Sequence, residues 1–175
     1  DSFAPPAQSL EEIWRMESSS KIPIMLITTP GADPSKELEE FAEKTVGKNK
    51  YQALAMGGGQ QQIALGMLRS AATNGDWLCL KNLHLVVAWL GVLEKELNVL
   101  ECHKDFRLWL TTEPHSRFPP ILLQTSLKIT YEAPPGIKKN MERTYANWSN
   151  EFISNGDARR SQLLFLLAFF HAVVQ

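Results

Sequence analysis

The residues with the clearest chemical potential follow an apolar run at positions 22–28, where a parallel-sheet protein would place a phosphate-binding loop. Such a loop reads G-x-x-x-x-G-K-[S/T], because its backbone N–H groups surround the phosphates, its lysine reaches the terminal phosphates and its Ser or Thr holds Mg²⁺. The segment here has one glycine and no Gly-Lys-Ser or Gly-Lys-Thr. It consists of Thr29, Pro30, Gly31, Ala32, Asp33, Pro34, Ser35 and Lys36. The sequence therefore predicts a degenerate loop.

The pair Asp33 and Pro34 is typical of a helix start, with an acidic N-cap followed by proline at the first helical position. The Asp33 carboxylate would accept the backbone N–H groups that a phosphate needs, and its negative charge would repel the phosphate. We therefore expect this helix to be capped by its own chain.

A second test lies at the end of the third apolar strand, where an active ATPase carries acidic residues that hold Mg²⁺ and polarise water. The strand here ends in Lys81 and Asn82. A lysine at a Mg²⁺ position is electrostatically wrong. Two losses in two separated motifs argue together against nucleotide hydrolysis.

The fourth strand ends in Thr111, Thr112 and Glu113, at the sheet edge where ligands often bind. We favour hydrogen bonding of the strand end over ligand binding for these three residues. By the same reasoning, His84 is expected to be a hydrogen-bonded packing residue rather than a base. Arg117 could face a neighbouring subunit, although an exposed arginine is common.

Other chemistries lack the residues that they need. Cys79 and Cys102 are the only cysteines and form no C-x-x-C pair, so we expect neither a disulfide framework nor a structural zinc site. His103 beside Cys102 has no further ligands nearby, and no Ser or Cys lies in a nucleophile elbow. Glycines 57–59 are read as a tight turn between a strand and a helix rather than as an anion cradle.

The elements that would position these residues alternate between strands and helices. Strands are expected at 22–28, 51–56, 77–80, 106–111 and 127–131, and helices at 34–46, 63–75 and 86–97. Continuous apolar strands separated by helices predict an α/β fold with a three-layer α/β/α core and a five-stranded parallel sheet. Leu10, Ile13 and Trp14 share one helical face near the start of the chain and predict a helix on the edge of that core.

The prolines at 134 and 135 with the glycine at 136 end this pattern. Beyond them Met141, Tyr145, Trp148 and Phe152 recur at helical spacing, and a last helix is expected from about Arg159 onward. The expected organisation is an N-terminal segment at 1–20, a core at 21–133 and a helical appendage at 134–175. Because the chain stops inside an apolar helical run, we expect it to be a fragment of a longer chain.

Charge and hydropathy limit the partners. Eighteen basic and nineteen acidic residues among 175 give a net charge of −1, which argues against a nucleic-acid-coating surface. The apolar run at 163–174 is too short to span a bilayer, which needs about 20 residues. We therefore expect neither nucleic acid nor a membrane among the partners.

Several long strings resemble the last AAA+ module of dynein heavy chains. They are residues 30–34, 75–85, 106–111, 122–130 and 134–140, and the similarity extends over most of residues 21–175 in the same order. The resemblance implies the AAA+ strand order 5-1-4-3-2, a helical lid that starts near residue 136 and is incomplete here, and membership of a six-module ring on one polypeptide. Residues 77–97 are most similar to the branch that drives retrograde intraflagellar transport in cilia and flagella.

The resemblance also implies a function. The sixth module of that family is not thought to bind or hydrolyse ATP, so ATP and Mg²⁺ would belong to other modules and this chain would hold no cofactor, metal or catalytic residue. Neighbouring modules would be direct partners, and intermediate chains, light chains and microtubules would be reached through the rest of a cytoplasmic, cytoskeletal motor. Two alternatives stay open: a nucleotide-binding or hydrolysing domain with an unorthodox loop, and an adaptor domain that binds proteins through its helical appendage.

Overall fold

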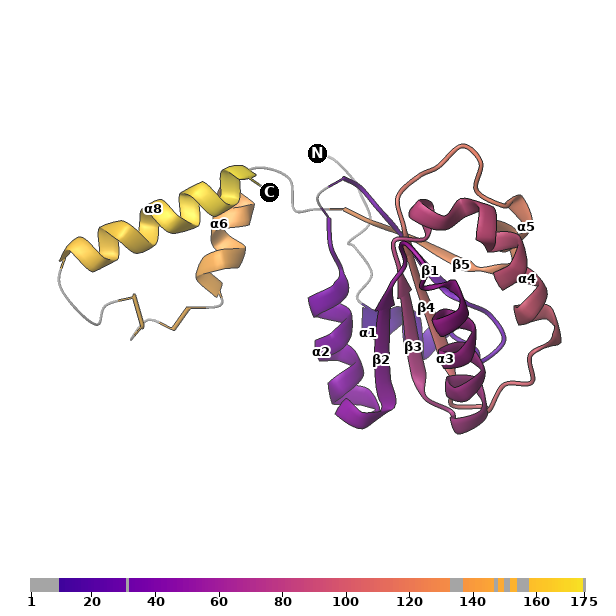
Figure 1. Cartoon of the computed structure of the whole chain (residues 1–175). Helices are drawn as coiled ribbons and strands as arrows, with labels where there is room; N and C mark the ends of the chain where they lie inside the picture. Colours follow the sequence, from indigo (N-terminus) through magenta and orange to yellow (C-terminus); the bar gives the residue numbers. More distant parts are fainter. Residues whose placement is uncertain are drawn as a thin grey trace. The chain divides into compact units, whose positions relative to one another are not determined.

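Five strands form one parallel sheet (Figure 1). The computed structural model describes residues 10–30, 32–132, 137–146, 148–149, 152–153 and 158–174. The strands are β1 (Ile24–Thr28), β2 (Tyr51–Ala55), β3 (Trp77–Lys81), β4 (Arg107–Thr112) and β5 (Leu127–Tyr131). Their order across the sheet is β2-β3-β4-β1-β5, which confirms the expected fold class and strand order.

Strand β1 is the pivot of the sheet, since it pairs with β4 on one side and with β5 on the other. Ile24 lies opposite Trp109 on β4 and opposite Leu127 on β5. Four of its five residues are buried, as expected of a parallel strand covered on both faces. Pro23 lies just before the strand, where its missing N–H costs no ladder hydrogen bond, and its carbonyl accepts the N–H of Leu127.

One face of the sheet is covered by α1 (Leu10–Glu17) and α2 (Ser35–Thr45). Its core is aromatic: the rings of Trp77 and Trp109 lie 5.5 Å apart, and Trp14 and Phe41 pack against them. Trp77 and Trp109 are fully buried. The edge helix predicted from Leu10, Ile13 and Trp14 is therefore present, and it completes this aromatic cluster.

The opposite face is mostly aliphatic and is covered by α3 (Gln61–Asn74), α4 (Leu90–Val99) and α5 (Pro120–Thr125). Arg69 on α3 and Glu96 on α4 form a two-point ion pair, with Nε–Oε1 at 2.5 Å and Nη2–Oε2 at 2.9 Å. Helix α3 ends at Gly75, whose φ of 76° is left-handed. A Cβ there would lie 2.5 Å from the His103 ring, so glycine is required for both conformation and space.

Two short helices complete the layers around the sheet, and one of them differs from the prediction. They are the 3₁₀ helices η1 (Lys48–Lys50) and η2 (Leu83–Trp89). The α-helix expected to start at Val86 begins only at Leu90, because η2 occupies the chain before it. In η2, Leu83 and Val86 are buried three residues apart, as in a 3₁₀ helix, and Val86 itself leaves helical geometry with φ −129° and ψ 34°. Helix α5 was not predicted at all.

The described residues belong to two compact units: those of 10–29 and 33–131 form the first, and Pro30, Ala32 and the described residues from 132 onward form the second. In the second unit α6 (Ile137–Ala146) packs against α8 (Ala158–Val174). Asn140 is buried and its Nδ2 donates to the carbonyl of Ala172 at 3.3 Å. The helical stripe expected to run on to Phe152 ends at Ala146. Among the described residues, none of the helices combines the length and hydropathy needed to cross a bilayer.

Candidate functional site

The predicted site residues of the first unit follow three neighbouring strands. Asp33 follows β1, Lys81 ends β3, and Thr112 ends β4 between them in the sheet. Because all three strands are parallel, their carboxyl ends meet at one edge, which is where α/β proteins bind ligands. Gly31 lies outside the described residues, and Pro30 and Ala32 belong to the second unit.

The start of α2 has lost two of the backbone donors that a phosphate site uses. Anchored on Ser35, the spacing G-x-x-x-x-G-K-[S/T] places Asp33 at the second glycine and Pro34 at the lysine. Pro34 has no N–H. The N–H of Ser35 donates to Asp33 Oδ1 at 2.9 Å. A phosphate at this position would therefore meet a proline, an occupied N–H group and a carboxylate.

This contact also adjusts the prediction of a cap at Asp33. The helix begins at Ser35 with Pro34 in the capping position, one residue later than expected. Pro34 makes no side-chain capping bond, and Asp33 supplies one from the residue before. The prediction of Asp33 as the N-cap with Pro34 at the first helical position is therefore wrong by one residue, although the Asp33 carboxylate does accept an N–H group of the helix start.

The charge distribution is the reverse of that in a nucleotide site. Hydrogen bonds from the Ser35 side chain, and then from its backbone N–H, hold the pKa of Asp33 below its ordinary value of 3.8, while partial burial opposes them. The positive charge of Lys81 lowers the same pKa further. The loop therefore carries an acid and the end of β3 carries a base, whereas a Mg²⁺–nucleotide site needs a basic loop and an acidic strand end.

Lys36, the one cation in the loop segment, does not supply the missing charge. Its Nζ lies 3.8 Å from Glu40 Oε1, one turn further along α2, and both side chains are exposed. The neighbouring Glu37 accepts a hydrogen bond from the Tyr131 hydroxyl at 2.7 Å. Both residues therefore belong to the surface of α2.

The ends of β3 and β4 are joined by hydrogen bonds. Asn82 has a left-handed φ of 61°, and its N–H donates to Thr111 Oγ1 at 3.0 Å. The N–H of Glu113 donates to His84 Nδ1 at 3.0 Å. These contacts agree with the prediction that His84 is a hydrogen-bonded packing residue.

The two threonines at the end of β4 are buried and engaged in the same way. Thr112 donates its hydroxyl to the Glu113 carbonyl at 2.9 Å, and its own carbonyl accepts the Thr28 hydroxyl at 3.4 Å. Thr111 and Thr112 are only 4% and 3% exposed. Hydrogen bonding of the strand end, the interpretation favoured from the sequence, is therefore what these residues do in the structure.

In the described ranges no three His, Cys, Asp or Glu side chains come together as ligands. Burial raises the pKa of Cys79 to about 12, and Cys102 also has a raised pKa because of burial. Gly57 and Gln60 close a turn through a 3.2 Å backbone bond, as the prediction of a tight turn requires.

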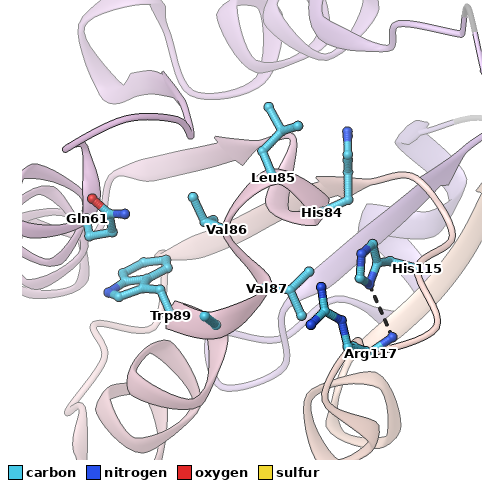
Figure 2. Close-up of a pocket in the computed structure, with 9 residues that line it drawn as sticks. Gln61, His84, Leu85, Val86, Val87, Trp89, His115 and Arg117 are labelled. Carbon is cyan, nitrogen blue, oxygen red and sulfur yellow. Dashed lines mark hydrogen bonds between the residues drawn. The ribbon is translucent and has the colours of Figure 1, made fainter.

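A groove beside this edge was not predicted from the sequence (Figure 2). It encloses about 360 Å³ and is lined by residues of η2, by Gln61 at the start of α3 and by His115 and Arg117 after β4. The sequence signal that pointed to it was Arg117, which was considered for a subunit contact. No sequence pattern marked Gln61 or His115, because only the folding of the chain brings both residues to the same groove.

Comparison with known proteins gives the family. Residues 19–130 match the family described as dynein heavy chain region D6 P-loop domain. This chain belongs to the dynein heavy-chain family. The resemblance drawn from its loop and strand motifs is thereby confirmed.

Dynein heavy chains of two branches are similar over most of this chain. It is 55% identical to cytoplasmic dynein 2 heavy chain 1 of Chlamydomonas reinhardtii over 99% of its residues, and 59% identical to the Homo sapiens protein of that name over 87%. Identity to human dynein axonemal heavy chain 10 is 45% over 98%. The chain spans 4% of the length of each of these relatives. The identities of 55% and 59% to cytoplasmic dynein 2 heavy chains exceed the 45% to the axonemal chain, in agreement with the branch suggested by residues 77–97.

Proposed function

We propose that this chain is a non-catalytic ring module of a dynein heavy chain of the cytoplasmic dynein 2 type. The motor would be ATP-driven, minus-end-directed and responsible for retrograde intraflagellar transport. The module would close the ring between the fifth and first modules and would relay rigid-body motion that is driven by hydrolysis elsewhere.

The observation that carries this proposal is the start of α2. A phosphate-binding helix needs free N–H groups. Pro34 has none, and Asp33 occupies the N–H of Ser35. The identity to cytoplasmic dynein 2 heavy chains supports the choice of motor, and the intact parallel sheet supports a structural role.

The surface of α8 is suited to contact with other protein segments. Its sequence is apolar on nearly every side, and side chains remain exposed along its length. Leu163 and Phe170 are each 65% exposed. Exposed apolar area of this size is typical of a protein contact, as a ring module needs.

The remaining assignments follow from the same proposal. The neighbouring modules of the heavy chain are direct partners, and intermediate chains, light chains and microtubules are reached through other parts of the motor. ATP and Mg²⁺ serve the other modules, and none is needed here. The module would act in the cytoplasm, on the cytoskeleton and in the cilium or flagellum.

The competing enzymatic proposal makes a different prediction about the motor. If this site hydrolysed nucleotide, its activity would depend on Thr112 or Glu113 at the end of β4, or on Ser35 at the start of α2. The test is microtubule-stimulated ATPase of the full heavy chain carrying Ser35→Ala or Glu113→Gln. We expect rates equal to the parent within error, since these side chains would touch no substrate, whereas a reproducible fall in either variant, up to the share of the total rate that this site supplies, would support hydrolysis here.

The adaptor proposal is favoured by one observation, the 44% exposure of Phe152. Phe152 packs against Trp148 with ring centroids 5.9 Å apart. Alanine at Phe152 separates the two roles, because a packing residue lowers the unfolding free energy whereas a surface anchor lowers only partner binding. A ring module predicts the first result, with a loss of about 3 kcal/mol or less for this partly exposed ring.

A further inference from the structure

The groove at the carboxyl edge of β2, β3 and β4 has one polar end and one apolar end (Figure 2). His115 and Arg117 lie at one end, and Trp89 and Gln61 at the other, with Leu85 between them. None of the lining residues is Asp or Glu. Neither Asp33 nor Ser35, whose hydrogen bond occupies the start of α2, lines this groove.

The apolar part is held open by the geometry of η2. Leu83 and Val86 are buried beneath this helix, so Leu85 between them faces outward and is 61% exposed. The N–H of Leu85 donates to the Asn82 carbonyl at 3.0 Å, which fixes the turn that presents it. An aliphatic side chain this exposed, on a rigid turn inside a groove, is suited to contact with another apolar group.

The polar part offers donors without acceptors. The Nδ1 atom of His84 accepts the N–H of Glu113, and the Nδ1 atom of His115 accepts the N–H of Arg117 at 3.1 Å. An imidazole that accepts at Nδ1 carries its proton on Nε2. Each ring therefore presents an Nε2–H donor on the side away from its backbone partner.

The third donor is the Arg117 guanidinium. Arg117 is exposed, and within the described part of the chain its side chain has neither a hydrogen bond nor an ion pair. Arg117 is the only Lys or Arg among the lining residues, so its guanidinium supplies the permanent positive charge of the groove. That charge matches one carboxylate, and the guanidinium fork fits a carboxylate in a two-point geometry.

We propose that this groove binds an acidic side chain carried on an apolar segment of the same heavy chain, with the carboxylate on Arg117 and an apolar neighbour on Leu85. The inference rests on the proposed function, since it requires a ring module within a longer chain. The relatives are about twenty-five times longer than the matched region, from a share of 4%. A tethered segment binds at a high effective concentration, so a small groove is sufficient.

The test uses the full heavy chain with p-benzoylphenylalanine in place of Leu85. A second probe at Ser116, between His115 and Arg117, covers the case in which added bulk at Leu85 blocks the groove. Val99 is 76% exposed and lies outside the groove lining, so the same probe there is the matched control. After irradiation, the attached peptide is identified by mass spectrometry.

We expect a peptide of the same heavy chain with an Asp or Glu beside apolar residues, absent from the Val99 control. Arg117→Glu should lower the yield at least about tenfold, because it places like charges together, and Arg117→Lys should lower it less. Replacing the identified acid by Lys in the Arg117→Glu chain should restore the yield. Equal thermal melting of these variants excludes unfolding as the cause.

The proposal would be overturned by a cross-link to another polypeptide, by a heavy-chain peptide without an acid, or by a yield unaffected by Arg117→Glu. The proposal would also be overturned if neither probe gave a cross-linking yield above that of the Val99 control. The outcome is independent of nucleotide binding, which is measured separately. A failed cross-link in a chain that binds no nucleotide rejects the groove alone, and a successful one in a chain that binds nucleotide rejects the silent site alone.

Discussion

The carboxylate of Asp33 lies 2.9 Å from the backbone nitrogen of Ser35, at the first residue of α2. This helix start is where a nucleotide phosphate binds in related folds, and here a side chain of the protein occupies it. The charge of Lys81, from the end of β3, favours the ionised carboxylate. The acid in the loop after β1 and the base at the end of β3, each at a position where a nucleotide site has another residue type, therefore attract each other.

Asp33→Ala should lower the unfolding free energy by about 1 kcal/mol near neutral pH, because the helix start loses its acceptor. The pKa of Asp33 is lowered in the folded state, so its stabilisation is present above the ordinary value of 3.8 and is lost as the pH falls through the folded value. Urea unfolding at several pH values measures this. The difference between variant and parent should vanish in acid.

Glu101→Ala is the matched control for this experiment. Glu101 is exposed, and no hydrogen bond or ion pair of its side chain occurs within the described residues. Its replacement should change the unfolding free energy by no more than about 0.5 kcal/mol. An Asp33→Ala effect equal to this control would show that the Ser35 contact contributes nothing.

Thr111→Val should lower the unfolding free energy by about 1–3 kcal/mol, because the N–H of Asn82 would lose its acceptor at a half-buried strand end. The same change at Thr73, which is exposed on α3, should cost much less. Thermal or urea melts compare the two. If the Thr111 variant kept its stability while ATPase of the full motor fell, Thr111 would act in a ligand site instead.

Cys79 should resist alkylation until the protein unfolds, because it is fully buried and its pKa is raised to about 12. Cys102 is half-buried and should react first, although burial raises its pKa too. Mass spectrometry after timed treatment with iodoacetamide gives both rates. Urea should bring the rate at Cys79 to that at Cys102, and fast reaction of Cys79 in the folded chain would contradict the burial.

Trp109→Ala should cost about 3–5 kcal/mol, since a fully buried ring leaves a cavity in the aromatic cluster. Trp109→Phe should cost less, partly because the buried indole N–H has no hydrogen-bond partner in the described structure. Val99→Ala, at an exposed position, is the control. Equal losses for Trp109→Phe and Trp109→Ala would show that the aromatic contact itself is unimportant.

The sheet could be predicted from the sequence because its strands are continuous apolar runs bounded by turn residues. The boundaries of β5 are those predicted, and Gly75 ends α3 as its position suggested. The strand order came from the dynein resemblance rather than from these patterns. Local periodicity carries no information about which strands pair.

The region after β3 could not be predicted, for a physical reason. Its apolar residues fit an α-helix, but the left-handed turn at Asn82 and the burial of Leu83 set a 3₁₀ helix instead. Tertiary packing overrides local preference there. The same turn exposes Leu85 and creates the groove, so neither the groove nor the role of His115 was visible in the sequence.

Calorimetric titration of the folded 175-residue chain with ATP and Mg²⁺ tests the central claim most directly. The occupied helix start and the lysine at the end of β3 predict no binding tighter than about 10 μM, which corresponds to about 6.8 kcal/mol. Tighter binding that is lost in a folded Ser35→Ala variant would contradict the account, because it would place a phosphate where Asp33 binds the helix.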